Sequence, residues 1–184
     1  MTNGGSAFAA MQALCAQFAA FLALLLVVSA VHKAMRWHHS RSVVRQFAGI
    51  TDSMVSASLA LAVGGELTAG ALLLVPTLRA IGAALAAVLW SVYLALMVRA
   101  IRQNRRDVDC GCSFGAVHRP LGSFQVSRNL VLVGLSMIVA VVSAAGSGPV
   151  IAGSQLLGAC ALMALYGALD QVMALEPLRG GEIS

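Results

Sequence analysis

The chain has 184 residues, of which 59% are hydrophobic and only 10% are charged, and its formal net charge is +5. Soluble domains are roughly 45–50% apolar and about 25% charged. A soluble fold this short could not bury so much apolar surface, so the composition argues against a soluble enzyme, a disordered tail and a disulfide-rich secreted scaffold. It predicts a membrane protein.

Five apolar stretches predict membrane-spanning helices, because a bilayer core needs about 20 apolar residues per helix. None of them alternates polar and apolar residues as the strands of a membrane β-barrel do. We therefore expect an all-α, polytopic transmembrane helix bundle that forms one domain over residues 1–184. The expected spans are residues 7–31, 54–75, 78–98, 127–145 and 150–170.

The first stretch could be a signal peptide instead of a span, and the fourth could lie in the membrane interface. No basic residue precedes residues 7–31, and the apolar run is longer than that of a signal peptide, so we expect an anchor helix. The apolar part of the fourth stretch, residues 130–145, is short. It either spans the membrane with help from the polar residues before it, or lies in the interface and leaves a four-span core.

The connections between the spans differ in length and charge. Residues 76–77 and 146–149 are tight turns marked by proline or glycine, so spans 2 and 3 form one hairpin and spans 4 and 5 another. Residues 32–53 and 99–128 are longer, and they hold four and six of the 12 lysine and arginine residues. The positive-inside rule then predicts an external N-terminus and a cytoplasmic C-terminus. This orientation accounts for the basic charge without a nucleic-acid partner.

The second long loop contains Cys110 and Cys112, separated by one glycine. Such a pair can close a tight disulfide ring, and strained, exposed disulfides are the labile or catalytic ones. We therefore predict a redox-active dithiol. Two alternatives stay open: a pair of unreactive loop cysteines, or half of a zinc or copper site completed by His118. The Cys-x-Cys spacing is uncommon for structural zinc.

Two further cysteines and one acid lie inside the predicted spans. Cys15 and Cys160 lie at comparable depth, so they are either small apolar residues or a second dithiol nearer the opposite face. Glu66 lies within its span and should face the bundle interior, because an unpaired charge there is costly. We expect it to be protonated, or to pair with Lys33 or Arg99 reaching in from the helix ends. Its role is then proton handling coupled to thiol chemistry, polarity at a quinone site, or a structural hydrogen bond.

These residues, in this order, resemble the methylamine utilisation protein MauE family, which is related to DoxX-type membrane proteins. Lys33 ends the first span, and Glu66 opens a Glu-Leu-x-x-Gly-x-Leu-Leu pattern. An arginine-rich stretch leads into the Cys-Gly-Cys motif, and Arg128 with Asn129 opens the fourth span. The Cys-Gly-Cys motif is the specific part of the resemblance, and this chain inserts Ser113 directly after it.

The resemblance implies a multi-pass protein of the bacterial inner membrane that is needed for maturation of the methylamine dehydrogenase β (small) subunit. That subunit is periplasmic and rich in disulfides, and the family works with a thioredoxin-like periplasmic partner, MauD. The implied role is disulfide formation, isomerisation or processing, with a quinone as the one candidate cofactor. The alternatives are a non-catalytic membrane scaffold and a Cys/His metal-handling protein.

The predicted orientation and the implied substrate lie on opposite sides of the membrane. The basic loops place Cys110 and Cys112 at the cytoplasmic face, whereas the substrate is periplasmic. Either electrons pass from this pair towards Cys15 and Cys160, or the topology is inverted and the dithiol faces the periplasm. The positive-inside rule is statistical and does not decide between them.

Overall fold

The computed structural model describes residues 3–48, 51–103, 123–146 and 148–175, and within them the chain forms six helices and no strand. Five of these helices are long and apolar enough to cross a membrane. The all-α prediction is therefore confirmed, and the protein is a multi-pass membrane protein. The helices are α1 (Asn3–Met35), α2 (Trp37–Ala48), α3 (Asp52–Leu74), α4 (Arg79–Arg102), α5 (Ser123–Ala144) and α6 (Gly153–Leu175).

The fourth apolar stretch forms a full-length span. Helix α5 begins at Ser123, so the polar residues before Leu130 extend it to 22 residues. Helix α5 is therefore long enough and apolar enough to cross a membrane, as the five-span expectation requires. The polar side chains in this first part of α5 are accommodated because Gln125 and Asn129 are buried against the bundle.

Helix α2 lies where the sequence suggested only a polar loop. It is short and strongly amphipathic, with Val43 buried and His38 and His39 exposed. Helix α2 packs against α3. The apolar residues of this segment are too few for a membrane span, so a search for spans passes over it. The helical spacing of its apolar residues is the sequence signal from which this helix could have been predicted.

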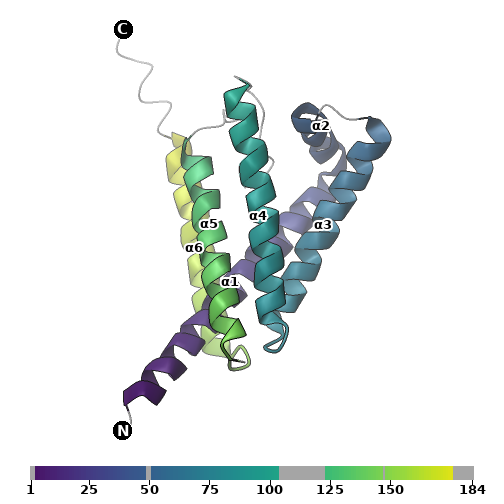
Figure 1. The fold of residues 1–184 in the computed structure, drawn as a ribbon. Helices are drawn as coiled ribbons and strands as arrows, with labels where there is room; N and C mark the ends of the chain where they lie inside the picture. Colours follow the sequence, from purple (N-terminus) through teal and green to yellow (C-terminus); the bar gives the residue numbers. More distant parts are fainter. Residues whose placement is uncertain (1–2, 49–50, 104–122, 147, 176–184) are drawn as a thin grey trace.

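The five spans run back and forth between two ends of the bundle (Figure 1). The first residues of α1, the turn between α3 and α4, and the connection from α5 to α6 share one end, which we call the turn end. Helix α2, the end of α4 and the start of α5 share the other, which we call the basic end because most of the arginines that the structure describes belong to these segments. Helix α1 crosses the other helices at a steep angle and contacts α3, α4, α5 and α6.

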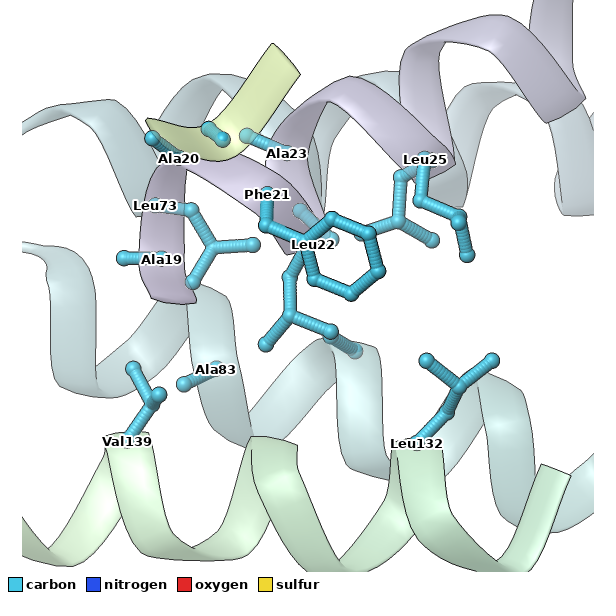
Figure 2. Packing of buried hydrophobic residues seen from close by; sticks show 14 of the residues in the cluster. Ala19, Ala20, Phe21, Leu22, Ala23, Leu25, Leu73, Ala83, Leu132 and Val139 are labelled. Carbon is cyan, nitrogen blue, oxygen red and sulfur yellow. The ribbon is translucent and has the colours of Figure 1, made fainter. Parts of the chain in front are cut away.

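Small residues allow α1 to occupy the centre of the bundle. Ala16, Ala19, Ala20 and Ala23 are fully or almost fully buried. Figure 2 shows α1 side chains packed together with residues of α3, α4 and α5. In a membrane, where lipid is as apolar as leucine, such small residues favour close helix packing. The core therefore depends on α1, whereas α6 buries the least of the five spans.

Gly82 lies where α4 approaches α3 most tightly. A Cβ atom at this position would lie 2.6 Å from the Leu73 backbone nitrogen and 2.8 Å from the Leu72 carbonyl carbon, and neither atom can rotate away. We expect Gly82→Ala to destabilise the folded protein by about 1–3 kcal/mol through overpacking. Thermal unfolding of the detergent-solubilised protein measures this. The matched control is Gly64→Ala in α3, where a Cβ meets nothing within 4 Å, and equal unfolding temperatures for the two variants would contradict the prediction.

Candidate functional site

A buried polar cluster lies inside the bundle, centred on the carboxylate of Glu66. Glu66 is fully buried in α3, and Lys33 of α1 forms a salt bridge with its Oε1 atom. The Tyr93 hydroxyl of α4 donates a hydrogen bond to the same oxygen at 2.8 Å, and Ser29 donates another at 3.1 Å. Side chains of α1 and α4 therefore converge on one carboxylate oxygen of α3.

Lys33 is held by the same neighbours that hold Glu66. Its ammonium group donates to Ser29 Oγ at 2.9 Å and to the Tyr93 hydroxyl at 3.3 Å, and it lies 4.6 Å from the centroid of the Tyr93 ring. Ser29 and Lys33 are four residues apart, so both point from one face of α1. The lysine side chain is 12% exposed and the glutamate side chain is 0% exposed. Ser29 and Tyr93 are partly exposed as well, so these three side chains separate the carboxylate from the surface of the bundle.

The two oxygens of Glu66 differ in their surroundings. Oε1 takes all of the contacts described above, while Oε2 is buried and has no hydrogen-bond partner among the described residues. A buried carboxylate oxygen without a partner is costly, so such groups are uncommon in folded proteins. Chemically, the cluster holds one oxygen rigidly and leaves the other available to bind a proton or a polar ligand atom.

The sequence identified the acid and one of its partners but not the whole cluster. Of the two cations expected to reach Glu66, Lys33 forms the pair, while Arg99 is exposed near the end of α4. Sequence reasoning missed Ser29 and Tyr93. Their only signal was position, because each is a polar group in an otherwise apolar span.

A second buried ion pair joins α5 to α6. Arg128 donates to Asp170 Oδ1 at 2.9 Å, both side chains are less than 10% exposed, and the guanidinium carbon lies 5.4 Å from the centroid of the Tyr166 ring. The neighbouring Asn129 donates to the Gln125 carbonyl and to the Met97 sulfur of α4. The Arg-Asn pair that opens this span therefore links α5 to both α4 and α6. Asp170 was not singled out from the sequence.

The two cysteines inside the spans have different surroundings. Cys15 is buried in α1, with its sulfur 3.5 Å from Ser143 Oγ and 3.8 Å from the Val139 carbonyl oxygen of α5. Cys160 is exposed on α6. Both are free thiols, so the structure does not bring them together as a disulfide.

The predicted loop dithiol lies outside the described residues, as does its alternative metal ligand. Cys110, Cys112 and His118 belong to the segment 104–122, of which the structure describes nothing. Within the described part of the chain, no three His, Cys, Asp or Glu side chains gather closely enough to hold a metal ion. Of the predicted site, the residues that the structure describes are therefore those of the membrane-embedded cluster around Glu66.

Comparison with known proteins gives one consistent result. A family profile described as methylamine utilisation protein MauE matches residues 11–143. Methylamine utilization protein MauE of Methylophilus methylotrophus is 33% identical over 157 residues, which cover 82% of this chain and 80% of that protein. The protein of the same name from Paracoccus denitrificans is 36% identical over 121 residues, covering 65% of this chain and 64% of the relative. No solved structure matches the chain significantly.

Proposed function

Since this chain belongs to the methylamine utilisation protein MauE family, we propose that it is a thiol–disulfide redox protein of the bacterial inner membrane. Its role is to support maturation of the methylamine dehydrogenase β subunit. It works there with a thioredoxin-like periplasmic protein, MauD. Both relatives are named for methylamine utilisation, and the five spans supply the membrane setting.

The reacting groups in this proposal are the thiols of Cys110 and Cys112. In thiol–disulfide exchange, a thiolate attacks a disulfide sulfur and a mixed disulfide forms. The second thiol of the pair then attacks that mixed disulfide, releases the partner as a thiol and leaves the Cys110–Cys112 disulfide. The partner gains two electrons and two protons, and the dithiol loses the same. Three arginines lie shortly before the motif and favour thiolates, although two aspartates beside it oppose them.

The observation that supports membrane redox chemistry best is the buried Lys33–Glu66–Tyr93 cluster. Ionisable groups inside a membrane are rare and usually functional, and each exchange between the dithiol and a partner disulfide moves two protons from one to the other together with the two electrons. Glu66 Oε2 has no partner among the described residues, and the side chains around Oε1 (Ser29, Lys33 and Tyr93) are each partly exposed. We assign to Glu66 the exchange of protons that accompanies the thiol chemistry, and to Lys33 and Tyr93 the positioning of its carboxylate.

Trapping of the mixed disulfide tests this proposal. If one thiol of the pair attacks and the other resolves, we expect either Cys110→Ser or Cys112→Ser to accumulate a covalent adduct with the thioredoxin-like partner. The adduct is detected in cells quenched with acid and alkylated, on non-reducing gels followed by mass spectrometry. It should vanish on reduction and in the double Cys110→Ser/Cys112→Ser variant. An adduct of equal amount in the double variant would refute the assignment of these two thiols.

A further inference from the structure

A groove runs along the outer side of α4, in the half of the helix that ends at the basic end of the bundle (Figure 1). It has a volume of about 510 Å³, and its lining includes Leu94, Ala95, Val98, Arg99 and Arg102. These residues recur every three or four positions, so they share one face of the helix. The buried residues in this half of α4 are Trp90, Met97 and Ala100, which lie on the opposite side. The groove therefore opens away from the helices that pack against α4.

The groove combines two cations with an apolar surface. Arg99 and Arg102 are three residues apart, so both guanidinium groups can reach one point near the end of the helix. Both residues are exposed, and neither takes part in the ion pairs formed among the described residues. Leu94, Ala95 and Val98 line the part of the groove that lies deeper in the span. Its charged end therefore calls for an anion, and the rest of it for an apolar chain.

The position of the groove along α4 matches one leaflet of a bilayer. Helix α4 has 24 residues, which at 1.5 Å per residue make about 36 Å. The hydrocarbon core of a bilayer is about 30 Å thick, so the last turn of α4 reaches the headgroups. From Ser91, at the deep end of the lining, to Arg102 the helix rises by about 16 Å. The groove thus extends from the headgroup region to about the middle of the membrane.

A second groove of similar size lacks this charge. It has a volume of about 480 Å³ and lies between α1 and α6, and it is lined by Ala10, Ala13, Leu14, Gln17, Ser154 and Gln155. None of these side chains is charged, so this groove offers an anionic group no ionic partner. The two arginines therefore distinguish the α4 groove from a hollow that any lipid chain could fill.

We propose that the α4 groove binds an anionic phospholipid from the leaflet at the basic end. The planar guanidinium groups of Arg99 and Arg102 hold the phosphate, whose geometry they match. One acyl chain lies against Leu94, Ala95 and Val98. Juxtamembrane basic clusters attract anionic headgroups, and a zwitterionic lipid is held less tightly because its own cation competes for the phosphate. The occupant is thus selected by charge at one end and by apolar contact along the other.

Native mass spectrometry of the full-length protein, stripped of lipid in a neutral detergent, tests this proposal. Phosphatidylglycerol and phosphatidylcholine with the same acyl chains are titrated separately, and the fraction of protein that carries one lipid gives each Kd. Each arginine near the headgroups strengthens the binding of an anionic lipid by about fivefold. We therefore expect phosphatidylglycerol to bind about tenfold or more tightly than phosphatidylcholine, and Arg99→Gln/Arg102→Gln to remove this preference. Equal Kd values for the two lipids on the unmodified protein would overturn the proposal.

The matched control is Arg36→Gln/Arg45→Gln, which removes two exposed arginines at the same end of the bundle but outside the groove. It lowers the net charge by the same amount, and it should keep the preference for phosphatidylglycerol. An equal loss in the two double variants would reveal a general attraction to positive charge and overturn the proposed site. All four arginines are exposed, so these substitutions leave the packed core of the bundle unchanged.

Two further measurements test that the occupant is a lipid. Ala95→Trp keeps both arginines and fills the apolar part of the groove, so it should weaken the binding of phosphatidylglycerol about tenfold. Inorganic phosphate in excess should leave the bound phosphatidylglycerol in place. Unchanged lipid binding in Ala95→Trp, or displacement by inorganic phosphate, would overturn the assignment of a lipid. Because every cysteine and the Glu66 cluster stay intact in these variants, none of the outcomes bears on the thiol chemistry proposed above.

Discussion

Lys33→Met should lower the free energy of unfolding by about 3 kcal/mol, and Glu66→Gln should lower it by a similar amount. Breaking a buried ion pair by removing one partner leaves the other charge without compensation, which typically costs about 3–5 kcal/mol. Here Glu66 would keep Ser29 and Tyr93 as donors, which limits the loss. Chemical or thermal unfolding of the purified protein in detergent measures both effects.

The double variant Lys33→Met/Glu66→Gln tests whether the two residues act as a pair. Because neither charge is then present, we expect it to recover most of the stability lost in either single variant. The control is the exposed ion pair between Arg45 and Asp52, whose side chains are 57% and 64% exposed. Arg45→Gln should cost less than about 1 kcal/mol. Additive losses in the double variant would show that the buried pair is not coupled.

The spans could be predicted from the sequence because membrane insertion constrains it strongly. Every backbone polar group in a bilayer must be satisfied within a helix, so long apolar runs indicate spans almost directly. The one weak stretch has a short apolar run because several polar residues, among them Gln125 and Asn129, dilute its start. In the structure both are buried against the bundle and not exposed to lipid. Whether a polar side chain in a span is buried against the bundle or exposed to lipid depends on the neighbouring helices, and the sequence of the span alone does not show where these lie.

The candidate site could be predicted only in part for a related reason. Glu66 and Lys33 were recognisable because charges in spans are rare, and the pairing followed from their opposite signs. Tyr93 and Ser29 are ordinary in membrane helices, and their roles arise from the angle at which α1 crosses α3 and α4. Nothing in the sequence marks Arg79, because a charge beside the turn at residues 76–77 is ordinary. Its complete burial near Gln12 and Gly148 depends on how the helices meet at the turn end.

Cys110→Ser and Cys112→Ser should each abolish production of mature methylamine dehydrogenase, because a serine oxygen cannot form or exchange a disulfide. We expect dehydrogenase activity in extracts of methylamine-grown cells to fall about tenfold or more. Ser113→Ala is the matched control: it changes the residue next to the motif without touching a thiol, and it should leave activity at the wild-type level. Immunoblots of membrane fractions must show equal amounts of each variant.

The same measurement separates a redox role from a scaffold role and reveals the route of the electrons. If both serine variants retain wild-type activity while deletion of residues 104–122 removes it, the loop serves as a docking segment and the redox proposal fails. If the serine variants lose activity, Cys15→Ser and Cys160→Ser decide what lies beyond the loop. A relay across the membrane requires both, and a dithiol that meets the substrate directly requires neither. Because Cys15 is buried in α1, Cys160 is exposed on α6 and the two are not joined, we expect both variants to retain activity.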